Sequence, residues 1–236
     1  RGSNMNSRHN GIVGVSAEGA ALCYRTICAE GEGLLGPHDH PEVSLHTHPL
    51  ARYMECIDEG DWRGVAELML SSVHKLQAAG ADFVICPDNT VHQALRFIEE
   101  RSPLPWLHIA DVVAEEARRR GFRKLGLTGT RWLVESDVYP ERLDSRGLAW
   151  ERPAPEDREA INRIIMDELV RGVISETAVA EFQRIIAALE GRGCEAVILG
   201  CTEIPLLMND GNSPLPTLDS TRLLARVALA RAVSRH

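Results

Sequence analysis

The chain has 236 residues, of which 44% are hydrophobic and 25% charged, and its formal net charge is −8. This composition is typical of a globular protein with a sizeable core, and it excludes a disordered protein, a collagen-like fibre and a coiled coil. The negative charge argues against a nucleic-acid partner, because nucleic-acid-binding proteins normally present a basic surface. No apolar run approaches the roughly 20 residues that cross a bilayer, so we expect no membrane partner.

Short apolar segments alternate with amphipathic ones along the whole chain. In chain order the pattern predicts strand 11–15, helix 20–30, strand 43–45, helix 62–79, strand 82–86, helix 92–100, strand 106–109, helix 112–120 and strand 125–128. Farther on it predicts helices 161–170 and 178–190, strand 196–199 and helix 220–233. Strands that alternate with helices form parallel sheets covered on both faces, so the fold class is α/β.

The cysteines carry no sign of a disulfide framework, because none of the six forms a Cys-x-x-Cys pair. A chain of this length does not need disulfides to be stable, and no secretory signal stands at its start. We therefore expect reduced thiols and a cytoplasmic location.

Two segments of the chain match each other without a gap. Residues 80–90 read GADFVICPDNT and residues 193–203 read GCEAVILGCTE, so Asp88 falls on Cys201 and Asn89 on Thr202. In both, a helix-ending glycine leads through an acidic residue into an apolar strand and then into a polar turn. The match indicates two similar α/β lobes, although two buried strands can also look alike over a stretch this short.

These two turns carry residues suited to proton transfer at carbon. Ligands of open α/β sheets bind at the carboxyl ends of strands, where both turns are expected. A thiol such as Cys201 and a carboxylate such as Asp88 can each take or return a proton beside a carbanion. Asn89, Thr90 and Thr202 would supply donors for a substrate carboxylate and an enolate-like transition state. Taken alone, Cys201 is more typical of a buried structural thiol, but its place after Leu-Gly at a strand end, followed by Thr-Glu, favours a site.

The segment Asp88-Asn-Thr-Val-His92, together with Leu199-Gly-Cys-Thr-Glu-Ile-Pro205, resembles the aspartate/glutamate racemase family of cofactor-independent amino-acid racemases. The resemblance runs from Gly11 to at least Met208. It implies two Rossmann-like lobes with parallel sheets related by a pseudo-twofold axis, an active site in the cleft between them, and a homodimer. On this basis we expect lobes over 5–110 and 111–212, with a C-terminal helix over 213–236 packing back on the first lobe.

The chain departs from the family at its first catalytic position. Members usually place a cysteine on each side of the substrate Cα; the second matches Cys201, whereas the first is occupied here by Asp88. Isolated thiols and aspartic acids differ in pKa, about 8.5 against about 3.9, so the pair is asymmetric unless burial raises the pKa of the carboxyl group. Cys86 lies two residues upstream and is expected in the core, with the role of substitute thiol as the alternative.

The resemblance also implies substrate contacts outside the two catalytic turns. Ser16 lies in the first strand-to-helix turn and Thr130 in the mid-chain turn that contacts the substrate carboxylate in the family. Arg52 falls where aspartate-specific members have an arginine that binds the distal carboxylate, a task suited to a guanidinium. A solvated surface arginine is the alternative for Arg52, and a structural role is the alternative for His92.

Other functions fit the sequence less well. His38, His40, His46 and His48 lie within eleven residues and form the candidate for a metal site. The segment Gly11-x-x-Gly14 lacks the spacing of a dinucleotide-binding loop, and neither Lys75 nor Lys124, the two lysines of the chain, is placed like a lysine that binds pyridoxal phosphate. We therefore expect no metal and no cofactor.

The sequence thus predicts a cofactor-independent amino-acid racemase or epimerase with Asp88 and Cys201 as its acid/base pair. The substrate is expected to be an acidic or polar amino acid, whose identity the sequence does not specify. Two alternatives stay open. One is a decarboxylase of the same superfamily that resembles arylmalonate decarboxylase and uses Cys201 alone, although a carboxylate at position 88 would repel the departing group. The other is a catalytically inactive paralogue that binds an amino acid.

Overall fold

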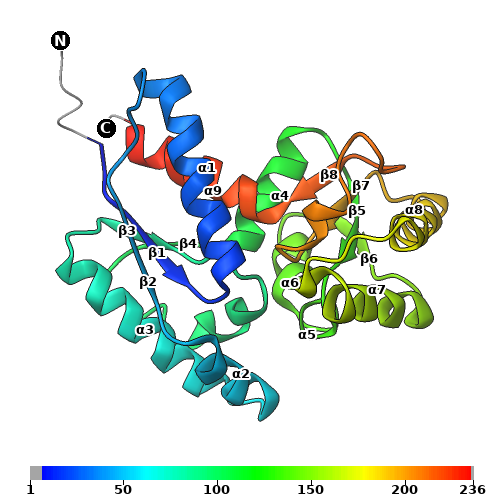
Figure 1. Ribbon diagram of the computed structural model, residues 1–236, viewed down its shortest axis with the longest axis horizontal. Helices are drawn as coiled ribbons and strands as arrows, with labels where there is room; N and C mark the ends of the chain where they lie inside the picture. Colours follow the sequence, from blue (N-terminus) through cyan, green and yellow to red (C-terminus); the bar gives the residue numbers. More distant parts are fainter. Residues whose placement is uncertain (1–6, 235–236) are drawn as a thin grey trace. The chain divides into compact units, whose positions relative to one another are not determined.

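The computed structural model describes residues 7–234 and divides into two units, each with its own sheet (Figure 1). One unit comprises the chain up to Ile109 together with the chain from Thr221 onward, and the other is Ala110–Ser220. Residues 5–6 of the predicted first lobe and residues 235–236 of the predicted C-terminal helix lie outside the described residues. The second unit is one continuous stretch, whereas the first is assembled from two separate stretches.

The sheet of the first unit is parallel and has the strand order β2-β1-β3-β4. Its elements are β1 (Asn10–Gly14), α1 (Ala17–Leu35), β2 (Val43–Thr47), α2 (Leu50–Asp58), α3 (Trp62–Ala78), β3 (Phe83–Ile85), the 3₁₀ helix η1 (Thr90–Phe97), β4 (Trp106–Leu107) and α9 (Ser220–Val233). Every residue of β1 and β3 is buried, as the continuous apolar runs predict for central parallel strands. Figure 1 shows α1 and α3 on opposite faces of this sheet.

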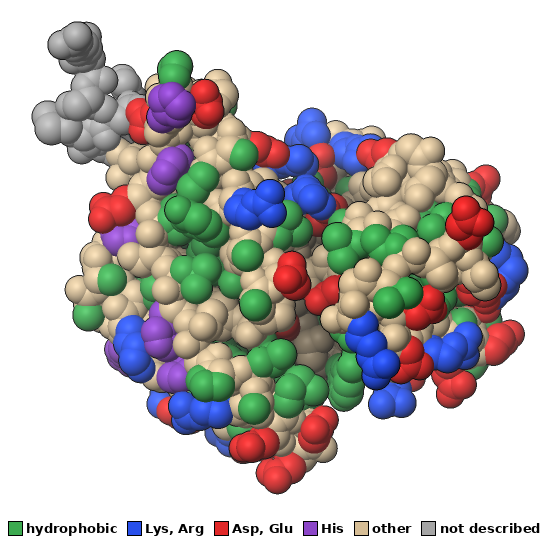
Figure 2. Space-filling model, viewed as in Figure 1, with side chains coloured by type: hydrophobic (Ala, Val, Ile, Leu, Met, Phe, Trp, Pro, Cys, Tyr) green, Lys and Arg blue, Asp and Glu red, His purple; other side chains and the backbone are tan. Residues whose placement is uncertain are grey.

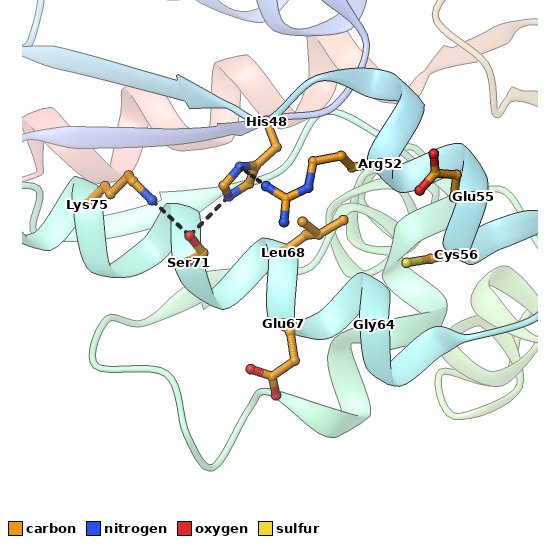
Figure 3. Close-up of a pocket in the computed structure, with 9 residues that line it drawn as sticks. All are labelled: His48, Arg52, Glu55, Cys56, Gly64, Glu67, Leu68, Ser71 and Lys75. Carbon is orange, nitrogen blue, oxygen red and sulfur yellow. Dashed lines mark hydrogen bonds between the residues drawn. The ribbon is translucent and has the colours of Figure 1, made fainter.

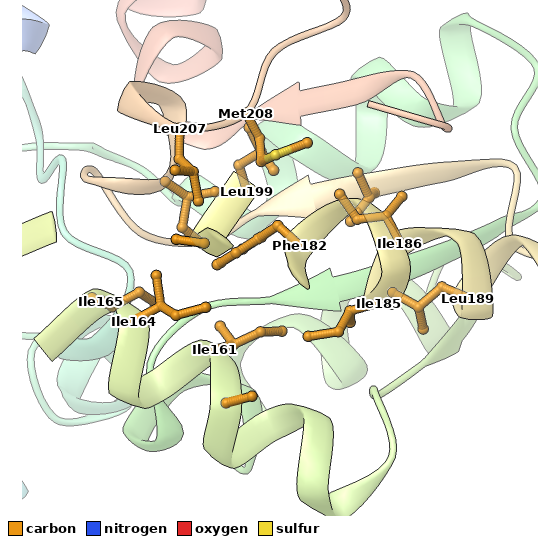
Figure 4. Packing of buried hydrophobic residues seen from close by; sticks show 14 of the residues in the cluster. Ile161, Ile164, Ile165, Phe182, Ile185, Ile186, Leu189, Leu199, Leu207 and Met208 are labelled. Atoms are coloured by element: carbon orange, nitrogen blue, oxygen red, sulfur yellow. The ribbon is translucent and has the colours of Figure 1, made fainter. Parts of the chain in front are cut away.

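The sheet of the second unit is also parallel and has the order β6-β5-β7-β8. Its elements are α4 (Ile109–Arg119), β5 (Lys124–Thr128), α5 (Arg131–Val134), α6 (Val138–Asp144), β6 (Ala149–Glu151), α7 (Pro155–Asp167), the 3₁₀ helix η2 (Leu169–Arg171), α8 (Glu176–Gly191), β7 (Ala196–Leu199), the 3₁₀ helix η3 (Ile204–Leu206) and β8 (Thr217–Asp219). Its core joins α7, α8 and the end of β7 through side chains such as Ile161, Phe182 and Leu199 (Figure 4).

The two sheets are built to one plan. Replacing β1, β2, β3 and β4 by β5, β6, β7 and β8 converts one strand order into the other. The register agrees as well: Val84 of β3 pairs with β1 and β4, and Val197 of β7 pairs with the corresponding strands β5 and β8. The predicted α/β fold with two similar units of parallel sheet is therefore confirmed, and the match between residues 80–90 and 193–203 has a structural counterpart.

Some elements differ from the sequence prediction. The edge strands β6 and β8 have three residues each and are only partly buried, so they lack the apolar run by which the other strands were recognised. The segment predicted as a helix over 92–100 is the 3₁₀ helix η1, which starts two residues earlier. None of the helices within residues 7–234 combines the length and the apolarity that a membrane crossing requires.

Candidate functional site

The turn that follows β3 places Asp88 at the start of η1. The N–H of Val91 donates to Asp88 Oδ1 at 3.1 Å, so the carboxylate caps the helix that begins two residues later. Asp88 is partly exposed, whereas Asn89 beside it is only 4% exposed, and Thr90 opens η1. Asp88 therefore has a structural task in addition to any chemical one.

His92 fixes the main chain at Asp88. Its Nδ1 donates to the carbonyl oxygen of Asp88 at 2.6 Å, and its Nε2 accepts from the N–H of Ile109 at 3.3 Å. Because Nε2 is an acceptor, the imidazole is neutral with its proton on Nδ1. The centre of the His108 ring lies 4.7 Å from that of His92, so the two imidazoles are in contact. The structural role considered for His92 is thus specific: it holds the turn that presents Asp88.

Cys86 is a core residue. Its side chain is 0% exposed, and burial, followed by the negative charge of Asp88, raises the pKa of the thiol well above its ordinary value. A thiol that stays protonated and inaccessible is a poor base or nucleophile. The structure thus favours the core interpretation of Cys86 over the role of substitute thiol.

The turn that follows β7 places Cys201 beside a glutamate. Cys201 Sγ donates to Glu203 Oε2 at 2.9 Å, and Thr202 Oγ1 donates to the same oxygen at 2.8 Å. Cys201 is partly exposed and packs with one side on the apolar core of its unit, so it is not a fully buried structural thiol. Glu203 was not predicted as a site residue, although its place in Cys-Thr-Glu, two residues after the thiol, is a signal that could have identified it.

Gly200 allows the turn before Cys201 to approach β5 closely. Its N–H donates to the Thr128 carbonyl oxygen at 3.0 Å, and a Cβ at this position would lie 2.6 Å from that same oxygen and would overlap Leu133. Any side chain here must push the turn away from β5.

We therefore expect Gly200→Ala to destabilise the protein by about 1–3 kcal/mol, the usual cost of overpacking, and to displace Cys201. Urea unfolding measures the first effect. Gly191→Ala, at the end of α8 where a Cβ would meet nothing within 4 Å, is the matched control and should change stability by no more than about 1 kcal/mol. Equal stability of the two variants would contradict the prediction.

Two other predicted contacts lie in turns at the carboxyl ends of strands. Ser16 follows β1, and its Oγ caps α1 by accepting from the N–H of Gly19 at 3.2 Å. Thr130 follows β5 and precedes α5, and the next residue, Arg131, donates its N–H to Asn162 Oδ1 of α7 at 2.9 Å. Ser16 and Thr130 are both partly exposed.

Arg52 lies on α2, where its guanidinium donates to His48 Nδ1 at 3.3 Å and lines a pocket between α2 and α3 (Figure 3). His46 and His48 instead bond to hydroxyl groups of α3, to Ser72 at 2.8 Å and Ser71 at 3.0 Å respectively. Within residues 7–234, no three histidine, cysteine, aspartate or glutamate side chains gather as metal ligands would. The predicted role of Arg52 towards a substrate stays a prediction.

Within each unit, the predicted residues of the two strand-ending turns lie at one edge of the sheet. In the first unit, Ser16 and the run Asp88–Thr90 follow the adjacent strands β1 and β3; in the second, Thr130 and the run Cys201–Thr202 follow the adjacent strands β5 and β7. Because the strands of each sheet are parallel, their carboxyl ends meet at one edge. Each unit therefore places one candidate acid/base group at the same sheet edge as hydroxyl or amide side chains, a combination suited to proton transfer beside a carboxylate.

Acidic and basic side chains are interspersed on the face shown in Figure 2. No large basic patch is visible on the part of that face that the structure describes, in keeping with the net charge of −8.

Known proteins resemble the chain over almost its full length. The family model for Asp/Glu/hydantoin racemases matches residues 12–228. A glutamate racemase of Thermus thermophilus is 32% identical over 158 residues, which are 65% of this chain and 56% of the Thermus protein. The broad-specificity amino-acid racemase RacX of Bacillus subtilis is 23% identical over 84% of this chain and 85% of RacX. The crystal structure of a Yersinia pestis protein assigned as an Asp/Glu racemase superimposes with a TM-score of 0.91 at 35% identity, covering 96% of this chain and 100% of that one. The chain thus belongs to the Asp/Glu/hydantoin racemase family, as the motifs around Asp88 and Cys201 predicted.

Proposed function

We propose that the protein is a cofactor-independent amino-acid racemase or epimerase in which Asp88 and Cys201 form the acid/base pair. One observation carries the proposal: the two residues stand at the same position after equivalent strands, β3 and β7, in two copies of one sheet. Membership of a racemase family supports the interpretation of this pair as two groups that transfer a proton at Cα. A carboxylate and a thiol in equivalent turns are what a two-base proton transfer requires.

In the proposed reaction one group removes the Cα proton and the other delivers a proton to the opposite face. The C–H bond breaks with its electron pair left on Cα and delocalised into the carboxylate, and the new C–H bond forms from that pair. Asn89, Thr90, Thr130 and Thr202, with Ser16 beside them, would hold the carboxylate and stabilise its additional charge by hydrogen bonds. None of these steps needs a cofactor.

Glu203 enters the proposal as the proton partner of Cys201. The thiol is nucleophilic and basic only as a thiolate, so its proton must leave before Cys201 can act as the base. Glu203 Oε2 lies 2.9 Å from Sγ, within hydrogen-bond reach of that proton, and Thr202 Oγ1 holds the carboxylate in place at 2.8 Å. A carboxylate so positioned can take the thiol proton and return it when the reaction runs the other way.

The choice of substrate rests on similar proteins. A Thermus relative is a glutamate racemase and the Yersinia protein is assigned to aspartate and glutamate, whereas RacX has broad specificity. We therefore propose an acidic amino acid as the first substrate to test, with Arg52 as the candidate contact for its distal carboxylate. A cytoplasmic homodimer belongs to the same proposal, and light scattering of the purified protein tests the dimer.

The test is Cα exchange in D2O. The protein is incubated with a panel of L- and D-amino acids, and deuterium incorporation and enantiomer ratio are followed by NMR and chiral chromatography. Exchange with racemisation that is lost in Cys201→Ala and in Asp88→Ala supports the proposal, whereas no exchange with any amino acid overturns it.

The same experiment separates the two alternatives. Release of CO2 from aryl malonates, lost in Cys201→Ala and without amino-acid exchange, would identify the decarboxylase. Saturable binding of an amino acid with neither exchange nor CO2 release would identify the inactive paralogue. Exchange of one enantiomer without inversion would show that only one of the two groups, Asp88 or Cys201, removes and returns the Cα proton.

A further inference from the structure

A pocket of about 490 Å³ lies between α2 and α3 at the carboxyl end of β2. Figure 3 shows His48, Arg52, Ser71 and Lys75 gathered at one end, with Leu68 and Cys56 farther along and Glu67 pointing away. These polar groups come from three elements: His48 follows β2, Arg52 belongs to α2, and Ser71 and Lys75 belong to α3. Apart from Arg52, none of them has a part in the proposed reaction.

Hydrogen bonds fix the state of His48 in this pocket. Arg52 donates to His48 Nδ1 at 3.3 Å, so Nδ1 carries no proton and Nε2 donates to Ser71 Oγ at 3.0 Å. Lys75 Nζ donates to the same Ser71 oxygen at 2.9 Å. The neutral imidazole of His48 is therefore bonded directly to the guanidinium of Arg52 and, through Ser71, to the ammonium of Lys75. No carboxylate takes part in this chain of hydrogen bonds.

Two cations and two carboxylates line the whole pocket, but neither carboxylate belongs to the hydrogen-bonded chain of Arg52, His48, Ser71 and Lys75. The titratable groups that face His48 are His46 from β2, Arg52, Glu55 and Cys56 from α2, and Glu67 and Lys75 from α3. Glu67 is engaged by Arg101, whose hydrogen bond lowers the pKa of that carboxyl group. Burial, followed by the charges on His46, Lys75 and Arg52, lowers the pKa of His48. Two cations thus converge on an imidazole that resists a third positive charge.

We infer that this end of the pocket binds the phosphate group of a small phosphorylated molecule. Phosphate carries a charge of about −1.5 to −2 near neutral pH and offers three acceptor oxygens, enough to accept from Lys75, Arg52 and a protonated His48 together. A carboxylate carries a single charge on two oxygens, so it would neutralise less of the positive charge gathered here than a phosphate does. The cavity exceeds the size of a phosphate ion, and the remaining space towards Leu68 and Cys56 suits the organic part of a monoester.

Phosphate binding at this place is linked to protonation of His48. An anion beside the imidazole favours its charged form, so the pKa of His48 is higher in the complex than in the free protein. Binding then takes up a proton, is strongest at low pH and weakens as pH rises through the pKa of the complex. Sulfate, which stays a dianion over this range, isolates this effect from the titration of phosphate itself.

The experiment is an NMR titration of the full chain, observing the imidazole of His48, which is assigned with His48→Gln. Inorganic phosphate, glycerol phosphate, sulfate and succinate are the probes. We expect saturable shifts with the two phosphates, tighter binding of the monoester, and a higher pKa of His48 with saturating sulfate than without it. Lys75→Gln and Arg52→Gln should each weaken phosphate binding about tenfold, as expected for the loss of one charge-assisted hydrogen bond.

Arg25→Gln, which removes one exposed arginine of α1 that does not line the pocket, is the matched control and should leave the affinity unchanged. Equal affinity for inorganic phosphate and the monoester supports a site for free phosphate rather than for an ester. No saturable shift with either phosphate overturns the inference, as does equal weakening in Arg25→Gln, which would indicate diffuse charge attraction. Binding of succinate or aspartate in preference to phosphate also overturns it and leaves Arg52 with its proposed role towards the distal carboxylate alone. The Cα exchange assay tests Asp88 and Cys201 and does not depend on phosphate binding. Failure of the racemase proposal would therefore be seen in that assay and not in the NMR titration.

Discussion

Asp88→Asn should abolish Cα exchange while leaving the fold intact. An asparagine retains the side-chain oxygen that accepts from the Val91 N–H at 3.1 Å, so the cap of η1 survives. The amide cannot take or give a proton, and loss of a general acid or base lowers rates by about 10²–10⁴-fold. Deuterium exchange measures the loss of activity, and urea unfolding should place the variant within about 0.5 kcal/mol of the parent.

Asp88→Ala is the matched comparison, because it removes both the cap and the acid. It should lose exchange to the same extent and, in addition, lose about 1 kcal/mol of stability. Together the two variants separate the structural task of Asp88 from its chemical one. An Asp88→Asn protein that keeps full exchange would show that Asp88 serves only as a cap and that the second acid/base group lies elsewhere.

Glu203→Gln should slow exchange about 100-fold and make it strongly dependent on pH. Glutamine can still accept from Cys201 Sγ and Thr202 Oγ1, so the turn after β7 keeps its shape. It cannot take the thiol proton, which must then leave for solvent. The rate of the variant should therefore climb with pH towards the range in which ordinary thiols ionise, about 8.5, whereas the parent has an internal acceptor at lower pH. A pH–rate profile for each protein makes the comparison.

Glu190→Gln is a control with the same chemical change, at an exposed position in the last turn of α8 in the same unit. It should leave both the rate and the pH profile unchanged. A Glu203→Gln protein with an unaltered pH profile would contradict the assignment of Glu203 as a proton acceptor, even if its rate fell, because a purely structural defect lowers the rate at every pH alike.

The fold could be predicted from the sequence wherever burial was complete. Strands β1, β3, β5 and β7 are almost wholly buried, and their apolar runs are unambiguous. The edge strands β6 and β8 escaped prediction because their three-residue segments, Ala-Trp-Glu and Thr-Leu-Asp, are too short to show an apolar pattern. The equivalence of the two units was also within reach, since the gapless match of residues 80–90 to 193–203 coincides with the observed register of β3 and β7.

The candidate site was predicted by residue type and position in the chain, but the partnerships of its side chains were not. Sequence patterns place Asp88 and Cys201 after strands, yet they do not state that one carboxylate oxygen caps η1 or that Glu203 turns back towards the thiol. These bonds depend on side-chain rotamers in short turns, which no periodicity encodes. The neutral state of His92 likewise needs its second partner, Ile109, which lies 17 residues away and on another element.

The division of the chain has a consequence for its order of synthesis. The second unit, Ala110–Ser220, is continuous, so all its strands and helices have been made before α9 emerges from the ribosome. The first unit needs α9: Leu224, Ala225 and Ala228 of that helix are buried, and the N–H of Arg8 donates to Ala232 O at 2.8 Å. Domains fold as units during translation. The unit that carries Cys201 is therefore the first that can complete its fold. The unit that carries Asp88 is mostly synthesised earlier but can be completed only after α9 has been made.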